Sequence, residues 1–552
     1  MYITKPTRKS KNGKTYETIL LRESYREGRR VKNRTLANLT HCKPEEIVAI
    51  ELALEYKNDL TALASLNESV RLQQGPSVGS VYAVYQVARR LGIAQALGNS
   101  FSGKLALWQV IARVIEQGSR LSAVRLAQTH AAGEVLGIPR GFDEAALYAN
   151  LKWLSQQQDS IERRLFQDRD GKQVPKLFLY DVTSRDLEGQ CNELSAYGYH
   201  RDGKKGKKQI VVGLLCDESG APVSVEVFSG NTQDTQTFYS QIRKVSKKFH
   251  GERVTLVGDR GMIKTAAIDE LTQAGFHYIT AITQPQIETL LHEGRIQMEL
   301  FDNDLCEVER EGVRYVLRRN PRRAEEIAAS REDKRRRIEA VVRKQNRYLR
   351  EHPQARVETA QRNIQEKIKR LRVDSWLSVE AVDRELVLRV EESSLERISR
   401  LDGCYVIKTD LPQAIADSQT IHDRYKDLAM VEWAFRTCKT THLEIRPVFV
   451  RTEESTRAHV LVVMLAYMIV RELRQAWKAL DVTVEEGLRL LSNVCTIEVV
   501  VKDKASCHKI PKPCEASQAL LKALEVRLPI VLPHRTVKVV TKRKLPSRRL
   551  SS

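Results

Sequence analysis

The sequence predicts a multidomain α/β protein built around a mixed β-sheet. Its 552 residues exceed the size of one ordinary domain, because domains average roughly 150 residues. Apolar residues make up 42% of the chain, enough for real hydrophobic cores, so wholesale disorder is excluded. The middle of the chain runs strand, strand, strand, helix, strand, helix, strand, which is typical of an α/β domain with a mixed sheet.

We expect two units before this central domain. Residues 1–43 have the sequence pattern of short strands and are predicted to form a small basic β-rich unit. Residues 44–170 place apolar residues at helical spacing, with a linker at Gln73–Pro76. This helical region is expected to bind DNA through a helix-turn-helix bundle, with an ordinary helical domain as the alternative.

The first part of the central domain spans residues 174–285. Short apolar runs bounded by polar residues predict its five strands, and an Asp-Glu-Ser-Gly turn makes the second and third an antiparallel hairpin. The strands are Lys176–Asp181, Gln209–Leu215, Val223–Phe228, Val254–Asp259 and His277–Ile282, and the helices are Thr235–Phe249 and Lys264–Ala274.

An insertion at 290–412 interrupts the central domain. It holds β segments at Leu300–Arg318 and Trp376–Val390 and a further strand at Gly403–Thr409. Between the first two, residues 323–371 are highly charged and predict a helical hairpin broken at His352-Pro353. The domain resumes at 413–476 with helices Asp423–Thr441 and His459–Gln475, and 477–552 form a C-terminal helical region with a basic tail.

The charge of the chain is positive and clustered. The formal net charge is +21, and basic residues gather in 1–40, 321–372 and 531–552. Basic patches favour a polyanionic partner, most often nucleic acid, over merely solvated faces and tails. The longest apolar run, Val460–Val470, is shorter than the roughly 20 residues that cross a membrane. Nine cysteines without framework spacing fit a reducing compartment.

Two aspartates stand where strands of the central domain are predicted to end. Asp181 ends the first strand and Asp259 ends the fourth. If these strands are neighbours, the two carboxylates converge at one edge of the sheet. Paired carboxylates without Cys or His suit hard cations such as Mg²⁺ or Mn²⁺. Taken singly, each is better explained as a turn-initiating Asp.

A third acid lies on the predicted helix Asp423–Thr441. Glu432 shares one face of this helix with two cations, while the opposite face is apolar and suited to packing. This face forms a stripe of side chains, in which Glu432 is either a metal-binding carboxylate flanked by phosphate-binding groups or part of a solvated salt-bridge ladder. We expect Trp433 to lie in the core rather than on a base-stacking surface. The stripe consists of Tyr425, Leu428, Glu432, Arg436 and Lys439.

This order of strands and acids resembles the ribonuclease-H-like catalytic domain of DDE transposases. The stretch Tyr425–Lys439 (YKDLAMVEWAFRTCK) is similar to the signature Y-x2-R-x3-E-x6-K of the insertion-sequence-four superfamily. Tyr425, Glu432 and Lys439 match it, whereas Leu428 occupies the position of the arginine, for which Arg424 and Lys426 are the candidate substitutes. The blocks YDVTS, GNTQD, VGDRGM and LEIRP and the loop GYHRDGKKGKKQ are also similar, so the resemblance covers residues 175–475.

The resemblance implies a transposase of an insertion sequence. Such an enzyme binds terminal inverted repeats, cleaves DNA and joins 3′-OH ends to target DNA by two-metal phosphoryl transfer, without a covalent protein–DNA link. Asp181, Asp259 and Glu432 would be the catalytic residues and hold two Mg²⁺ or Mn²⁺ ions. The implied DNA-binding residues are Tyr425, Arg436, Lys439, Arg201, Lys204, Lys205, Lys207 and Lys208.

The implied partners are the double-stranded DNA of transposon ends and target, and a second copy of the chain in the DNA complex. No membrane is involved, and the location is the cytoplasm at the nucleoid of a bacterium or archaeon. Two alternatives stay open: a nuclease that cuts without joining, and a non-catalytic DNA-binding derivative. The charged hairpin at 323–371 is expected to touch DNA or the partner subunit, with a solvated hairpin equally possible.

Overall fold

The computed structural model divides the chain into two compact units. One comprises residues 1–161, 440–445 and 461–552, and the other comprises 162–439 and 446–460. The second unit holds all three acids of the predicted site. The structure describes residues 1–9, 15–55, 57, 70–167, 175–187, 189, 191–199, 206–248, 254–302, 304–440, 442–447, 449–501 and 505–532.

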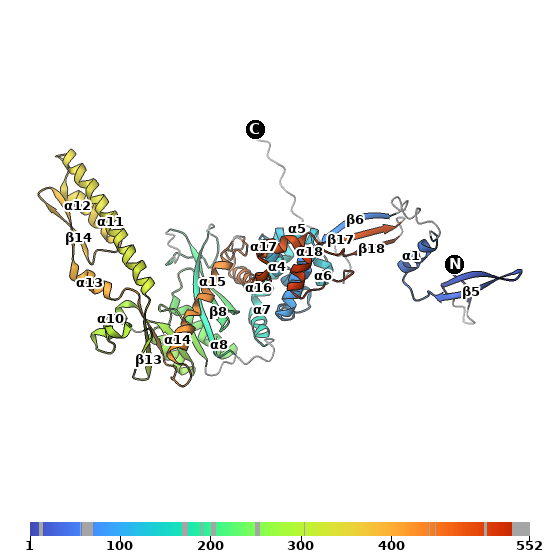
Figure 1. The fold of residues 1–552 in the computed structure, drawn as a ribbon, viewed down its shortest axis with the longest axis horizontal. Coiled ribbons are helices and arrows are strands. Elements are labelled where there is room, and N and C mark those ends of the chain that lie inside the picture. Colours follow the sequence, from blue (N-terminus) through green and yellow to red (C-terminus); the bar gives the residue numbers. More distant parts are fainter. Residues whose placement is uncertain are drawn as a thin grey trace. The chain divides into compact units, whose positions relative to one another are not determined.

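An eight-stranded mixed sheet organises the unit of residues 162–439 (Figure 1). Strands β7 and β8 pair antiparallel, as do β8 and β9, whereas β10 is parallel to both β7 and β11. The order β9-β8-β7-β10-β11 is the ribonuclease-H-like arrangement that the sequence predicts. These strands are β7 (Leu177–Asp186), β8 (Gln209–Asp217), β9 (Pro222–Ser229), β10 (Thr255–Gly258) and β11 (His277–Ala281).

The two faces of this sheet are covered differently. Alternate side chains of β7 point to opposite faces. Tyr180 and Val182 join the core cluster under α8 (Asp234–Lys248) and α9 (Thr265–Gln273), which also contains Phe238 and Leu271. Asp181, on the other face, lines a pocket together with α15 (Leu428–Cys438), a helix that contacts β7 and β8.

The prediction that Asp181 ends its strand is wrong. Strand β7 continues to Asp186, because β8 pairs with it over its whole second half, from Asp181↔Leu214 to Asp186↔Gln209. Only the parallel neighbour stops early, at the pair Tyr180↔Gly258. Asp181 therefore lies where the ladder to β10 ends, which still brings it beside Asp259.

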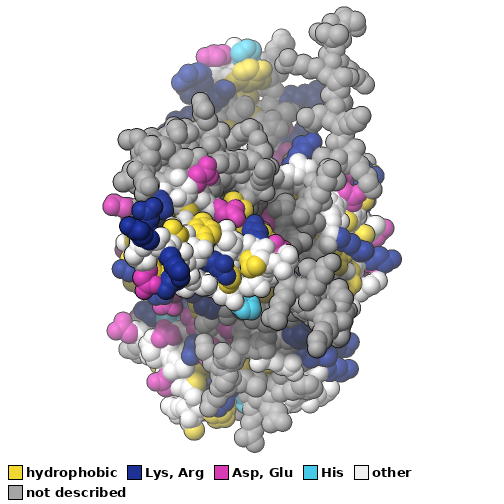
Figure 2. Space-filling model, turned by 90° about the vertical axis from the view of Figure 1, so that its right-hand side faces the viewer, with side chains coloured by type: hydrophobic (Ala, Val, Ile, Leu, Met, Phe, Trp, Pro, Cys, Tyr) yellow, Lys and Arg dark blue, Asp and Glu magenta, His cyan; other side chains and the backbone are white. Residues whose placement is uncertain are grey.

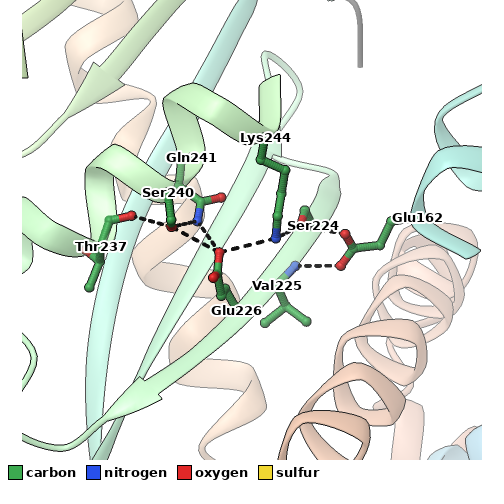
Figure 3. A network of polar contacts seen from close by, with 8 residues as sticks. All are labelled: Glu162, Ser224, Val225, Glu226, Thr237, Ser240, Gln241 and Lys244. Atoms are coloured by element: carbon green, nitrogen blue, oxygen red, sulfur yellow. Dashed lines mark hydrogen bonds and ion pairs between the residues drawn. The ribbon is translucent and has the colours of Figure 1, made fainter. Parts of the chain in front are cut away.

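A polar network fixes the edge of the sheet at β9 (Figure 3). Glu162 of α7 (Glu144–Gln167) is fully buried and accepts hydrogen bonds from Ser224 Oγ at 2.8 Å and from the Val225 amide at 3.2 Å. Lys244 of α8 donates to Ser224 Oγ at 2.9 Å and pairs with Glu226 at 3.3 Å. The network thus joins α7, β9 and α8 through hydrogen bonds and a partly buried ion pair rather than apolar packing alone.

The sheet continues beyond β11 with three antiparallel strands. Strand β16 (Cys404–Thr409) pairs with β11, and β13 (Val313–Arg319) pairs with β16 and with β12 (Cys306–Arg310). A small core lies between these strands, α10 (Gln284–His292) and the 3-10 helix Met298–Phe301.

The predicted helical hairpin is confirmed as α11 (Pro321–Glu351) and α12 (Val357–Arg370). The two helices contact the β14–β15 hairpin (Leu377–Val382 and Glu385–Val390), followed by α13 (Glu392–Arg400). Together they enclose their own hydrophobic cluster around Ile338, Ile364 and Trp376. The insertion is therefore a packed subdomain rather than a long loop (Figure 1).

The predicted helix Asp423–Thr441 is two helices. Helix α14 (Ser418–Lys426) ends and α15 begins on either side of Asp427, a single turn residue. The predicted apolar face of α15 is confirmed, because Val431, Ala434 and Phe435 are buried. Trp433 is 45% exposed, so the expectation that it lies in the core is wrong.

The other unit is helical with small sheets. A three-stranded sheet near its start contains β1 (Tyr2–Thr4), β4 (Leu20–Glu27) and β5 (Arg30–Asn38), and β2 (Thr7–Lys9) pairs with β3 (Thr15–Glu17). Its helices are α1 (Pro44–Glu55), α2 (Gly79–Arg90), α3 (Ile93–Leu97), α4 (Phe101–Ile115), α5 (Arg120–Thr129), α6 (Ala132–Leu136), α17 (Val484–Ser492) and α18 (Glu515–Ala523). Helices α7 (Glu144–Gln167) and α16 (Glu453–Trp477) contribute to both units, and the 3-10 helix Lys478–Leu480 follows α16.

Two predictions for this unit are wrong. Gln73–Pro76 is not a linker, because it lies in β6 (Val70–Ser77), which pairs with β17 (Cys495–Val501). The C-terminal region is not purely helical, because β17 also pairs with β18 (Ala505–Lys509). The partner of β6 lies over 400 residues away in the chain, so local sequence carries no sign of this pairing. The predicted tail falls largely in 533–552, outside the described residues.

Cations are spread over the described surface. On the face drawn in Figure 2, Lys and Arg side chains appear in several places, with Asp and Glu side chains between them. Within the described ranges, no helix combines the length and the apolar character that crossing a bilayer requires.

Candidate active site

A pocket of about 740 Å³ opens on the α15 face of the large sheet. It collects polar side chains from β7, β10, α8, α14 and α15, and from the strands of the insertion. The lining consists of Asp181, Val182, Thr183, Asp234, Asp259, Met262, Asn320, Tyr405, Tyr425, Lys426, Leu428, Ala429, Glu432, Phe435, Arg436 and Lys439. All three predicted acids are in this set.

The sheet register brings the two aspartates together. Asp181 and Asp259 each follow directly on the paired residues Tyr180 and Gly258 of parallel neighbours. Each carboxylate is fixed by a local backbone bond: Asp181 Oδ1 accepts from the Val182 amide at 2.8 Å, and Asp259 Oδ1 from the Arg260 amide at 2.7 Å. The condition set by the sequence, that the two strands be neighbours, is therefore met.

Glu432 faces the same pocket from α15. Its Oε2 lies 3.8 Å from Arg436 Nη2, one helical turn away, and both side chains are more than half exposed. Lys439 caps the end of α15 and also lines the pocket. The Glu432–Arg436 pair is the salt bridge that a solvated helix surface predicts. The same side chains and Lys439 also line the pocket, as a metal-binding carboxylate flanked by phosphate-binding cations would.

Tyr425 connects α14 to the aspartates. Its hydroxyl donates to Asp259 Oδ1 at 3.4 Å. Burial, and then the charge of Asp259, raise the pKa of Tyr425 well above its usual value. Tyr425 is therefore a neutral phenol at physiological pH, which acts as a hydrogen-bond donor rather than as a charged nucleophile.

The donor chemistry of the pocket fits a hard divalent cation. Its four acidic side chains, Asp181, Asp234, Asp259 and Glu432, offer oxygen ligands, and neither Cys nor His belongs to the described lining. As the side chains lie, no group of three or more acidic, His or Cys side chains among the described residues is close enough to enclose an ion. The pocket thus fits a divalent cation in the type of its ligands and in their presence in one pocket.

The position of the missing signature arginine is now defined. Leu428 begins α15 and lines the pocket with an apolar side chain. Arg424 is engaged by Asp427 at 3.2 Å, whereas Lys426 belongs to the pocket lining. Of the two substitutes that the sequence offers, Lys426 is the one that lines the pocket.

Only part of the predicted basic loop is described. Arg201, Lys204 and Lys205 lie outside the described residues. Lys207 pairs with the buried Asp186 at 3.8 Å, and Lys208 lies 5.9 Å from the centre of the Tyr197 ring. The C-terminal end of the loop is therefore anchored to β7 at Asp186 and held beside Tyr197.

Among the lining residues that sequence reasoning did not single out are Asp234, Asn320 and Tyr405. Asp234 opens α8, and a Cβ on Gly261 would lie 3.9 Å from its Oδ2, so it stands beside the turn that carries Asp259. The block GNTQD, noted only as a family resemblance, was the available signal for Asp234. No local pattern marks Asn320 or Tyr405, which reach the pocket through the sheet extension.

Tyr405 is held by a buried histidine. Its hydroxyl lies 2.6 Å from His422 Nε2, and Arg318 Nη1 lies 3.2 Å from the same nitrogen. Because a guanidinium only donates, Nε2 accepts and the proton is on Nδ1, 3.3 Å from Asp423 Oδ1. Burial lowers the pKa of His422, which agrees with a neutral ring. This cluster ties α14 to β13 and β16 at the rim of the pocket.

The fold and the site define a class of nucleic-acid enzymes, and comparison with known families specifies it. The family model of the transposase DDE domain matches residues 172–469, more than half of the chain, and the chain belongs to this family. The model of the IS1634 family transposase N-terminal domain matches residues 3–67. The prediction of a DDE transposase of an insertion sequence is confirmed, and DNA is its partner.

Comparison with individual proteins adds little to this result. No curated protein matches the chain. A synaptic complex of the piggyBac transposase with hairpin DNA has a TM-score of 0.34 at 10% identity, covering 76% of this chain and 69% of that one. The Mos1 transposase paired-end complex with the left transposon end has a TM-score of 0.14 at 13% identity, covering 25% and 43%. Both TM-scores are too low to carry an argument about this chain.

Proposed function

We propose that the pocket cleaves the ends of a transposon and joins the resulting 3′-OH ends to target DNA. Asp181, Asp259 and Glu432 are the catalytic residues, and they hold two divalent cations, Mg²⁺ or Mn²⁺. When bound, such ions activate the attacking oxygen and stabilise the leaving 3′ oxygen of an in-line phosphoryl transfer. Water attacks in the cleavage step and a DNA 3′-hydroxyl in the joining step, and the displaced 3′ oxygen takes up a proton.

One observation carries this proposal. Two aspartates follow directly on paired residues of parallel neighbours, in the same pocket as the glutamate of a separate helix. Turn-initiating aspartates on unrelated loops have no reason to share a pocket with a third acid and with Arg436 and Lys439. A mixture of acids and cations is what a site needs to hold both metal ions and phosphates.

The remaining side chains have positioning roles in this proposal. The neutral Tyr425 donates to Asp259 and so restrains that carboxylate. Arg436 and Lys439 bind phosphates beside the bond that is cut, and Lys426 supplies the cation that Leu428 lacks. The basic loop, with Arg201, Lys204, Lys205, Lys207 and Lys208, contacts the DNA backbone. Two copies of the chain act together on two transposon ends.

The test uses the full chain and duplex DNA from the flanks of its own gene. Asp181→Asn, Asp259→Asn and Glu432→Gln should each lower cleavage by more than about a hundredfold, beyond what loss of a supporting group costs, while DNA binding persists. The matched control is Asp269→Asn, an exposed acid of α9 outside the pocket, which should leave cleavage unchanged. Near-normal cleavage by any of the three pocket variants would remove that residue from the proposed site.

A second readout separates transposase from nuclease. A duplex with a pre-formed 3′-OH transposon end should be joined to plasmid DNA when Mg²⁺ is supplied, and chelator should stop the joining. Cleavage without joining would identify a nuclease of the same fold. Neither reaction, with intact DNA binding, would identify a non-catalytic derivative.

A further inference from the structure

The last turns of α11 form a braced helix with a fixed outer face. Its inner face buries Ile338, Val342 and Leu349 in the core of the inserted subdomain. Asn346 pairs with the backbone of Leu386 through two hydrogen bonds of 2.9 Å, one from its amide and one to its carbonyl oxygen. Arg384 donates to the carbonyl oxygens just beyond the helix, at 3.0 to 3.1 Å. The rotation of α11 about its axis is therefore set.

The outer face of these turns is basic. We call it the α11 ridge and define it by five exposed cations, which fall on one side of the helix at its 3.6-residue period. From 340 to 350 the helix contains no acidic residue. The ridge consists of Arg337, Arg343, Lys344, Arg347 and Arg350.

The first half of α11 is different. All its arginines up to Arg336 pair with acids of the same helix or of the loop before β16: Arg323 pairs with Glu326 at 2.8 Å, and Arg331 with Asp402 at 2.7 Å. On the ridge, by contrast, no cation forms an ion pair with any residue that the structure describes. The positive charge of the ridge is thus left to face solvent or a ligand.

The ridge matches the dimensions of a DNA strand. Residues 337 to 350 extend over about 20 Å of helix, and a DNA strand carries about six phosphates over that length. Four of the five side chains are arginines, whose planar guanidinium groups bind phosphates with two parallel hydrogen bonds. A protein interface would instead be expected to centre on apolar and aromatic side chains, with few charges.

The helix also has a direct relation to the pocket. Asn320, which lines the pocket, is the residue that caps α11, because its side chain accepts from the Arg323 amide at 3.1 Å. The ridge begins 16 residues beyond Pro321, which is about 24 Å along the helix. DNA that leaves the pocket in this direction would be supported by the ridge after roughly seven base pairs.

We propose that the α11 ridge binds the sugar-phosphate backbone of double-stranded DNA beside the pocket, without regard to base sequence. This proposal rests on the proposed function, which brings DNA to the pocket, but it does not depend on the cleavage and joining reactions. The occupant is the flanking duplex of the transposon end, held by charge and by release of counterions. The ridge therefore supplies part of the salt dependence of binding.

The experiment compares two variants of the full chain, each lacking three cations of the same subdomain. The ridge variant is Arg337→Gln with Arg343→Gln and Arg347→Gln. The control variant is Arg322→Gln with Arg336→Gln and Arg389→Gln, exposed cations that already pair with acids. Both carry Asp181→Asn, so that binding to a labelled blunt duplex is measured without cleavage.

The ridge variant should lower the slope of log affinity against log salt by up to about 2.7, since each phosphate contact contributes about 0.9. Affinity near physiological salt should fall at least about tenfold, while the control variant changes little. Replacing the same three arginines by lysine should restore most of the slope, because the charge remains. This rescue also guards against misreading an unfolded variant.

Three outcomes would overturn the proposal: an unchanged slope in the ridge variant, an equal fall in the control variant, or loss of a dimer in sedimentation without any effect on DNA. The last outcome would make the ridge a subunit contact. Because cleavage is not measured here, these outcomes are independent of the pocket variants. Inactive pocket variants with an unchanged ridge slope would leave the proposed function standing and remove only the ridge.

Discussion

Two β-hairpins of the molecule each carry a diagonal Arg–Glu pair, in different surroundings. In β12–β13, Arg314 faces Glu309 in the register and reaches across to Glu307; in β14–β15, Arg389 faces Ser378 and reaches Glu380. The Arg314 side chain is 2% exposed, and that of Arg389 is 60% exposed.

The comparison teaches that the burial of an Arg–Glu pair, rather than its place in a hairpin, decides how much the pair stabilises the protein. Arg314 binds Glu307 through two hydrogen bonds of 2.7 and 2.8 Å and also donates to the carbonyl oxygens of Leu411 and Ala416, both at 2.8 Å. These carbonyls belong to the connection that leads from β16 into α14 and Tyr425. Arg389 makes one contact of 3.0 Å to a solvated carboxylate. The buried pair holds the connection that leads into α14, whereas the exposed pair lies on the surface of its hairpin.

The largest effect should follow from removing Arg314. Arg314→Met leaves Glu307 without its cation and two buried carbonyls without a donor, which should cost about 3 kcal/mol or more of unfolding free energy. Urea denaturation of the full chain measures this loss. Cleavage should fall as well, because α14 loses its anchor.

Arg314→Lys tests the geometry of this anchor. It keeps the charge but cannot form the paired bonds to Glu307, so its stability should lie between those of wild type and Arg314→Met. If Arg314→Met costs no more than a surface substitution, the contrast between the two hairpins is broken.

The next effect concerns Gly213, in the middle of β8, the strand next to the edge strand β9. A Cβ at this position would collide with the hydroxyl of the buried Tyr180. Gly213→Ala should therefore cost about 1–3 kcal/mol, the usual range for overpacking. Tyr180→Phe removes the closest of the colliding atoms but leaves ring carbons at 2.9 and 3.0 Å, so combined with Gly213→Ala it should recover only part of the loss in a double-mutant cycle.

Gly189→Ala is the matched control, because a Cβ there would meet no described atom within 4 Å. It should change the unfolding free energy by less than about 0.5 kcal/mol, as exposed substitutions do. If removing the Tyr180 hydroxyl recovers none of the Gly213 loss, the contact with the hydroxyl is not its cause.

The same distinction explains how far the sequence alone could reach. The order of strands, the helical hairpin and the basic charge of α11 are written in local patterns, and the sequence predicted each of them. The extension of β7 past Asp181 and the pairing of β6 with β17 depend on partners remote in the chain. Local patterns carry no trace of those partners.

The residues of the pocket also fall into those that the sequence could identify and those that it could not. Asp181, Asp259 and Glu432 could be named because their residue types, order and family resemblance agree. Asn320 and Tyr405 could not, because the sheet extension and a buried histidine bring them to the pocket. A pocket built from distant elements is visible in a sequence only as far as its residues fit a known signature.

A smaller effect should appear as a pH dependence of stability. Burial lowers the pKa of His422, so protonation favours the unfolded chain, and His422 should destabilise the protein as the pH falls below about 6.5. Arg318 and Lys426 add to the lowering, and Asp423 opposes it. The pKa of Asp423 is itself lowered from 3.8, so loss of its contribution lies at more acidic pH.

The measurement is the unfolding free energy of wild type and His422→Gln between about pH 5 and 7. The variant should lose less stability on acidification, by at most the slope of one proton, about 1.4 kcal/mol per pH unit. His130 and His442 also have lowered pKa values and slope in the same direction, so only the difference between the two proteins reports His422. Parallel curves would mean that His422 binds a proton equally well in the folded chain.

The smallest effect should belong to the exposed hairpin. A cycle of Arg389→Gln and Glu380→Gln should give a coupling energy below about 0.5 kcal/mol, because solvent screens the pair and two long side chains must be ordered. High salt should reduce even this value, since both side chains are more than half exposed. The Arg314–Glu307 cycle under the same conditions should give several times as much and respond less to salt. A coupling above about 1 kcal/mol at Arg389–Glu380 would mean that the hairpin itself, rather than burial, sets the strength of a diagonal pair.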